Sequence, residues 1–254
     1  TVVNSTTITA TTAAHATGPV AVVVTNTDSL SGTKSSGFTY TGHSVKASIA
    51  GARSSFTLNG SADDYWLSIE AVGGRSYCAL RAASATAQTT ATVTLTALRG
   101  DAATSLATSA GVTPMNCFIA PATETVYVKT TQSDHSRRPH LILVNETTLW
   151  ANWFFIGGSY SSYSLLRNTT DADVHAVITW RSDTGAQAGT ETITIPGHGV
   201  VFRNARDKVG GGTTAGSIEI AHDGEPEALV GSQTTLSAVT GLSFDTLTFQ
   251  RRPQ

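Results

Sequence analysis

Residues 91–98 read ATVTLTAL, in which apolar and hydroxyl-bearing side chains alternate as far as Ala97. A period of two places every apolar side chain on one face of an extended strand, so this stretch predicts a half-buried β-strand. The same texture returns in residues 174–180 (VHAVITW) and 191–195 (ETITI). Strand-like segments recur about every 8–12 residues, with turn-forming residues between them, which is typical of β-sandwiches. The sequence therefore predicts an all-β protein of tandem β-sandwich domains, immunoglobulin-like or jelly-roll-like.

The composition of the 254 residues excludes several classes of protein. Hydrophobic residues make up 40% of the chain, enough to form cores and to argue against wholesale disorder. Only 13% of the residues are charged and the net charge is -2, so no basic surface is available to follow a nucleic-acid backbone. No run of about 18 or more apolar residues occurs, so we expect no helical membrane span. The first residues lack the charged and apolar regions of a signal peptide, so we expect a mature product or a piece of a longer chain.

The chain contains two cysteines, Cys78 and Cys117. Two cysteines near predicted strand ends, in a chain rich in Thr, Ser and Gly, favour one disulfide over two buried free thiols. A loop of this length would give the disulfide a stabilisation of roughly 3–4 kcal/mol. A disulfide indicates an oxidising compartment, so the expected location is extracellular or at the cell surface.

The N-terminal segment carries a recognisable order of strand and turn residues. Residues 6–41 read TTITATTAAHATGPVAVVVTNTDSLSGTKSSGFTYT. This order resembles the C-terminal half of an IPT/TIG domain, an immunoglobulin-like module, on the basis of Val22 and Val24, Asn26-x-Asp28, Ser31-Gly32 and Gly37-Phe38-Thr39-Tyr40. The family often has Pro where Ala13 stands here, and its upstream strands are missing from this sequence.

The resemblance covers about 40 residues of a module that should be about twice as long. Half a sandwich leaves strand edges and one sheet face bare, so an upstream segment, the next domain or another molecule must complete it. The residues expected to carry this assembly lie on two strands: Val20, Val22, Val24, Phe38 and Tyr40.

The rest of the chain resembles two further β modules. Residues 43–146 resemble the bacterial pre-peptidase C-terminal domain in Asp64-Tyr65-Trp66-Leu67, Gly74-Arg75-Ser76-Tyr77 and residues 118–128. That resemblance implies an accessory module of secreted bacterial proteins, without chemistry of its own. The order LLRNTT, ITW and GSIEIAHDG in the last region is similar to a repeat-like β module of bacterial surface and secreted proteins. We therefore expect three domains, over residues 1–42, 43–146 and 147–254.

The motifs of known active sites are missing from the sequence. None of the seven histidines forms a helical metal-binding pair, and Gly157-Gly158-Ser159 has no identifiable base. The triplet Gly210-Gly211-Gly212 lacks the Lys-Ser/Thr of a phosphate loop. Asp134-His135 with His140 could begin a metal site, but the better interpretation is a solvated loop. The sequence thus predicts a protein that is not an enzyme.

The carboxylate pairs leave a calcium site open. Asp63 and Asp64 precede a predicted strand, where loop oxygens can hold a structural Ca²⁺, and Asp171 with Asp173 is a weaker candidate. Surface turn residues are the default interpretation of both pairs. We expect no cofactor other than such a structural calcium ion.

An aromatic cluster is the remaining candidate site. Trp150, Trp153 and Phe155 could form a platform on which sugar rings stack, or they could pack in a core or an interface. Trp153 and Phe155 alternate and should share one strand face, which favours the core or interface.

Two classes of function follow. The first is a non-enzymatic extracellular bacterial structural protein, a self-assembling filament or surface-layer subunit joined through its incomplete N-terminal module. Low charge supports it, because little repulsion opposes packing of copies. The alternative is a ligand- or carbohydrate-binding accessory region of a secreted hydrolase or adhesin. The expected partners are thus other copies of the chain or glycans, without nucleic acid.

Overall fold

The computed structural model describes residues 2–4, 6–9, 18–40, 44–46, 52–58, 64–82, 91–134, 137–210, 212 and 214–251. Most of these residues lie in antiparallel strands, and the described helix, α1 (Arg206–Val209), has four residues. The all-β prediction is therefore confirmed. The chain divides into two compact units, Thr1–Ser44 and Val45–Gln254. No helix among the described residues has the length and apolar character needed to cross a membrane.

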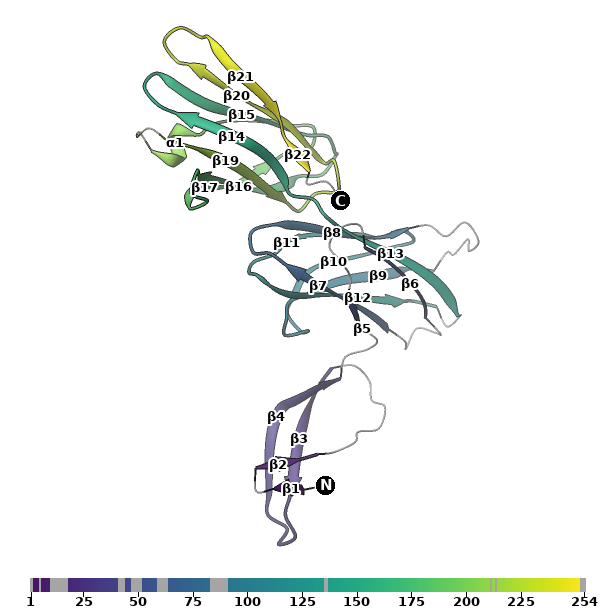
Figure 1. The fold of residues 1–254 in the computed structure, drawn as a ribbon. Coiled ribbons are helices and arrows are strands. Elements are labelled where there is room, and N and C mark those ends of the chain that lie inside the picture. The colour runs from purple at the N-terminus through teal and green to yellow at the C-terminus, as the bar shows by residue number, and fades with distance from the viewer. Residues whose placement is uncertain are drawn as a thin grey trace. The chain divides into compact units, whose positions relative to one another are not determined.

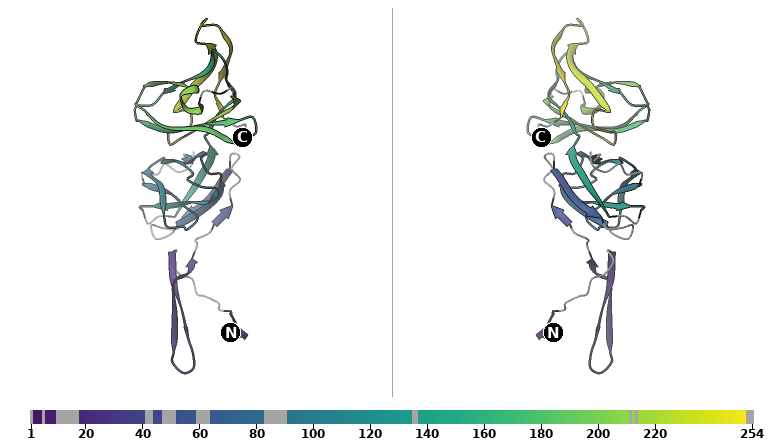
Figure 2. Two further views of the ribbon diagram at one scale, coloured as in Figure 1. Left: turned by 90° about the vertical axis from the view of Figure 1, so that its left-hand side faces the viewer. Right: turned by 90° about the vertical axis from the view of Figure 1, so that its right-hand side faces the viewer.

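The first unit consists of two small sheets. Strands β1 (Val2–Asn4) and β2 (Thr7–Ile8) pair with each other, and β3 (Gly18–Thr25) and β4 (Ser31–Tyr40) form a long hairpin (Figure 1, purple). Both views in Figure 2 show this hairpin as a narrow two-stranded ribbon. Neither hydrophobic core of the described residues includes a residue of this unit.

The second unit begins with a sandwich of two sheets. One sheet has the order β10-β9-β12-β7-β5 and the other β11-β8-β13-β6. The strands of this sandwich are β5 (Ser44–Lys46), β6 (Ala52–Leu58), β7 (Asp64–Ala71), β8 (Ser76–Ala82), β9 (Val93–Leu98), β10 (Ser105–Gly111), β11 (Met115–Ile119), β12 (Glu124–Gln132) and β13 (Arg138–Glu146).

Alternation builds the core of this first sandwich. Val93, Leu95 and Ala97 of β9 are fully buried, whereas Thr94 and Thr96 between them are partly exposed. The buried face of β9 packs with the inner faces of β7, β8, β11, β12 and β13. The strand predicted from residues 91–98 is therefore confirmed, with β9 beginning at Val93.

A second sandwich follows, again with two sheets (Figure 1, green to yellow). Its sheets have the orders β17-β16-β19-β14-β22 and β18-β15-β20-β21. The strands are β14 (Leu149–Ile156), β15 (Tyr160–Asn168), β16 (Val174–Ser182), β17 (Gln187–Ile195), β18 (Val200–Asn204), β19 (Thr214–His222), β20 (Leu229–Ser237), β21 (Ser243–Thr248) and β22 (Gln250–Arg251).

The two sheets of the second sandwich have unlike inner faces. The first is apolar and includes Trp180 and Phe154, both fully buried. The second presents hydroxyl and amide groups: Ser162 Oγ lies 2.6 Å from Thr235 Oγ1, and Gln233 Nε2 donates to Thr235 Oγ1 at 3.0 Å. These hydrogen bonds offset part of the cost of removing the polar groups from water, although Gln233 Oε1 is buried without a hydrogen-bond partner among the described residues.

A connection of two residues joins the sandwiches. Thr147 and Thr148 are both buried, and each forms a hydrogen bond with Ser76 of the first sandwich. The expected boundary after residue 146 falls at this connection, and the one expected after residue 42 falls beside the division at Ser44. Residues 45–146 and 147–254 thus have separate cores but belong to one compact unit.

Candidate functional site

The hairpin β3–β4 exposes apolar side chains on both of its faces. Val22 and Val24 share one face because they are two residues apart, and Val23 lies on the other. Their exposed fractions are 40%, 43% and 57%, and Phe38 is 47% exposed. Val20 is half-buried; Tyr40 ends β4, and its side chain lies outside the described residues. The predicted assembly strands thus form one hairpin with an apolar surface.

Three properties of this hairpin bear on whether it associates with another surface. In the described part of the chain its sheet has two strands, and an isolated hairpin is marginally stable in water. Its outer edges present backbone groups that another strand or surface can cover. Asp28 and Lys34 are the only charged residues in positions 18–40, so little repulsion opposes such a contact.

The aromatic residues of β14 divide between the core and the surface. Phe154 is fully buried in the second core, whereas Trp153 and Phe155 are half-buried on the opposite face. Their rings are parallel, with 6° between the planes and 5.9 Å between the centroids. Trp150 lies at the junction of the sandwiches, with the guanidinium carbon of Arg75 5.0 Å from its ring centroid. The structure thus pairs Trp153 with Phe155 and keeps Trp150 apart from that pair.

Among the carboxylates proposed for calcium, Asp64 and Asp171 have other partners. Asp63 lies outside the described residues, and Asp64 forms an ion pair with Lys129 at 3.2 Å. Among the described residues, no group of three or more His, Cys, Asp or Glu side chains is placed to hold a metal ion. Asp171 accepts a hydrogen bond from His198 at 2.7 Å.

His140 is part of a buried polar network. Its Nε2 lies 2.9 Å from Gln132 Oε1, and its Nδ1 lies 3.2 Å from Arg81 Nε. His135, its expected companion in a metal site, lies outside the described residues. The network fixes His140 in the first sandwich instead of leaving it in a solvated loop.

The predicted disulfide between Cys78 and Cys117 is confirmed. The two residues are directly opposite on β8 and β11, so the bond links neighbouring strands of one sheet. Tyr77 and Ala79, on either side of Cys78, belong to the core, and Cys78 therefore faces outward. Its sulfur lies 3.6 Å from the carbonyl oxygen of Gly224 in the second sandwich.

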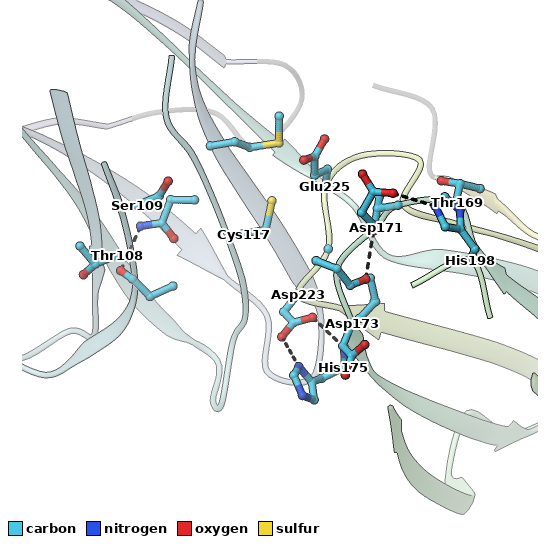
Figure 3. Close-up of a pocket in the computed structure, with 17 residues that line it drawn as sticks. Thr108, Ser109, Cys117, Thr169, Asp171, Asp173, His175, His198, Asp223 and Glu225 are labelled. Atoms are coloured by element: carbon cyan, nitrogen blue, oxygen red, sulfur yellow. Dashed lines mark hydrogen bonds and ion pairs between the residues drawn. The ribbon is translucent and has the colours of Figure 1, made fainter. Parts of the chain in front are cut away.

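A cavity of about 690 Å³ lies beside this disulfide, between the two sandwiches (Figure 3). His175 and Asp223 point toward each other across 2.8 Å, and His198 and Asp171 do so across 2.7 Å. The first sandwich contributes a neutral wall and the second an acidic one. The lining residues are 107–109, 115–117, 169–175, 198 and 223–225.

The chemistry of this cavity is that of hydrogen bonding and attraction of cations. Four carboxylates line it against two imidazoles, so its net charge is negative. Both His–Asp pairs are largely exposed to solvent, which screens them and limits their contribution to stability. Within the described ranges, neither histidine forms a hydrogen bond with a hydroxyl group, and Cys117 is oxidised. The cavity therefore shows no paired nucleophile and base.

These pairs could not be predicted from the sequence. His175 and Asp223 are 48 positions apart, and Asp171 and His198 are 27 apart. Only the pairing of β16 with β17 and β19 brings them together.

An exposed apolar surface on the second sandwich was also missed. It lies on the outer face of sheet β18-β15-β20-β21, where Leu165 pairs with Phe202 and Arg167 lies between Val200 and Val230. The four apolar side chains are 44–57% exposed. The apolar sheet face, as it is called below, consists of Tyr163, Leu165, Arg167, Val200, Phe202 and Val230.

Comparisons with known proteins add little. No protein-family model and no curated protein matches the sequence. Among solved structures, the chain is similar to a calcium-binding mutant of Bacteroides uniformis β-glucuronidase 2, with 11% identity over 73% of this chain and 26% of that chain, and a TM-score of 0.22. A second Bacteroides uniformis β-glucuronidase structure gives 13% identity over 78% and 25%, with a TM-score of 0.19. The chain spans about a quarter of the length of these enzymes, and TM-scores this low carry no argument about function.

Proposed function

We propose that this chain is a non-enzymatic extracellular structural protein of bacteria, whose copies join through hairpin β3–β4 into a filament or surface layer. The exposure of Val22, Val23 and Val24 on both faces of a two-stranded sheet carries the proposal. Contiguous exposed apolar surface on a folded protein marks an interaction site.

The energy available from covering the hairpin is sufficient to matter. Full burial of a valine side chain contributes about 1.5–3 kcal/mol, so covering the exposed halves of Val22, Val23 and Val24 adds about 2–4 kcal/mol. Phe38 adds to this sum because aromatic side chains bury the largest areas. Ordering a hairpin has an entropic cost, and contacts of this size offset part of it.

The remaining properties of the chain support an extracellular role. The Cys78–Cys117 disulfide is the kind of bond that persists in oxidising compartments. The charged fraction of 13% leaves copies free to pack without strong repulsion. The resemblances of the sequence to modules of bacterial surface and secreted proteins support the same setting.

The test is the concentration dependence of assembly. The purified chain is followed by analytical ultracentrifugation and imaged by negative-stain electron microscopy. We expect ordered polymers of the parent chain and their loss in the variant Val22→Thr/Val23→Thr/Val24→Thr, which keeps β-branched side chains but adds hydroxyl groups. The matched control is Val239→Thr, since Val239 is 82% exposed in another unit. A parent chain that stays monomeric at every concentration overturns the proposal.

A carbohydrate-binding accessory module is the second candidate function. The parallel, half-buried rings of Trp153 and Phe155 favour it, because the faces of aromatic rings suit the apolar faces of sugars. Binding on a glycan array that disappears in Trp153→Ala but persists in the Val22→Thr/Val23→Thr/Val24→Thr variant would favour this function over assembly.

A further inference from the structure

We propose that the apolar sheet face of one copy receives hairpin β3–β4 of the next copy. The inference rests on the proposed function and names the surface that accepts the hairpin. It starts from a simple observation: among the described residues, hairpin β3–β4 of the first unit and the apolar sheet face of the second each expose several neighbouring apolar side chains.

The register of the strands makes the apolar sheet face continuous. Leu165 and Phe202 are directly opposite on β15 and β18, and Tyr163 is two residues from Leu165 on the same side. The rings of Tyr163 and Phe202 are nearly parallel, with 5.2 Å between their centroids. Val200 and Val230, 57% and 46% exposed, extend the surface across β15. Three adjacent strands thus contribute apolar side chains to one face, with Arg167 among them.

The composition of this face suits a protein partner better than a sugar. Leu165, Val200 and Val230 are aliphatic and offer no hydrogen bonds to hydroxyl groups. Phe, Tyr and Arg, by contrast, are enriched where proteins bury surface against one another. A hairpin with exposed valines supplies the apolar side chains that such a surface can cover.

Charge complementarity points to the hairpin as the occupant. Arg167 is exposed in the middle of the face, between Val200 and Val230, and its guanidinium group forms no ion pair with the described residues. The turn of the hairpin carries Asp28, which is also exposed. Asp28 accepts a hydrogen bond from the backbone of Leu30 at 3.1 Å and has no cationic partner in the described ranges. Arg167 and Asp28 can therefore pair between copies while the apolar side chains pack around them.

This contact joins different surfaces of the two copies. The donor hairpin belongs to the first unit and the acceptor face to the second. In a pair of copies, the copy that donates its hairpin therefore still has a free acceptor face, and the copy that accepts it still has a free hairpin. Contacts of this kind continue from copy to copy unless rotation closes a ring. The contact therefore gives the proposed filament its direction.

The experiment is a charge swap between the two surfaces. We expect Arg167→Asp alone, and Asp28→Arg alone, to raise the concentration needed for assembly at least ten-fold, and the double variant Asp28→Arg/Arg167→Asp to return it toward the parent value. Arg137→Asp is the matched control because it makes the same change of net charge at another exposed arginine. Urea unfolding of each variant checks that the fold is intact.

The outcomes separate the two proposals. Assembly of the parent chain that is unchanged by Arg167→Asp overturns the acceptor face but leaves the proposed function standing. Two single variants that fail to assemble, with no rescue in the double variant, also overturn the pairing. A glycan that binds the parent chain and is lost in Phe202→Ala, without any effect on assembly, would assign the face to sugar binding instead. A parent chain that never assembles overturns the proposed function itself.

Discussion

His222 makes the stability of the second sandwich depend on pH. It is the last residue of β19 and is 1% exposed. Burial lowers the pKa of His222 from 6.5 to about 4, and hydrogen bonds with the backbone of Thr147 and Gly224 and the charge of Asp223 offset only part of this effect. Arg251 adds a smaller contribution in the same direction as burial.

The sign and size of the effect follow from these pKa values. Below pH 6.5, His222 binds a proton in the unfolded chain, whereas in the folded chain it stays neutral until the pH approaches about 4. Acid therefore favours unfolding. The loss grows between pH 6.5 and about 4 and is constant at lower pH. One pKa unit corresponds to about 1.4 kcal/mol, so the full loss is about 3 kcal/mol, with about 2 kcal/mol of it between about pH 7 and 5.

The measurement is urea unfolding followed by tryptophan fluorescence, with Trp180 as the buried reporter in the same core as β19. His222→Gln removes the titrating group, so the difference between the two proteins cancels the titration of all other groups. We expect the parent chain to lose about 2 kcal/mol more than the variant when pH falls from about 7 to 5. Equal losses in the two proteins would refute the reasoning.

Two further changes test the packing. Replacing Cys78 and Cys117 with alanine opens a loop of 39 residues and should reduce the free energy of unfolding by up to about 4 kcal/mol in urea titrations, and a loss below about 1 kcal/mol would contradict this. Gly216→Ala places a Cβ atom against the carbonyl oxygen of Arg181, so it should lower stability by at least about 2 kcal/mol, whereas Gly111→Ala, with open space around its Cβ, should change it by less than about 0.5 kcal/mol. Equal thermal midpoints of the two glycine variants would contradict this difference, because the strands would then accommodate the added Cβ atom without loss of stability.

The fold class could be predicted because alternation is a local property. In β9, threonines and aliphatic residues alternate, and the structure buries the aliphatic set. The disulfide was predictable for a different reason, since a chain with two cysteines allows one pairing within itself.

The aromatic strand β14 shows where local reasoning is insufficient. Its register against β19 shifts between Ala151 and Phe154, so the strict alternation expected along the strand is interrupted. Phe154 is therefore the buried ring, and Trp153 and Phe155 share the outer face. A bulge of this kind depends on the neighbouring strand and has no signature in β14 itself.

The surfaces that carry the two proposals also differ in how far the sequence alone reveals them. The valines of the hairpin are adjacent in sequence and were visible as a strand. The apolar sheet face draws Leu165, Phe202 and Val230 from three separate strands, and each alone is an ordinary exposed residue. Only sheet register shows that they form one surface.

The short connection between the sandwiches has a mechanical consequence. Thr147 and Thr148, even fully extended, span no more than about 7 Å, and both are already held by Ser76. A pulling force along the proposed filament therefore could not be relieved by extension of this connection. Extending this part of the molecule requires separating strands from a sheet, so the two sandwiches would resist extension together as one unit.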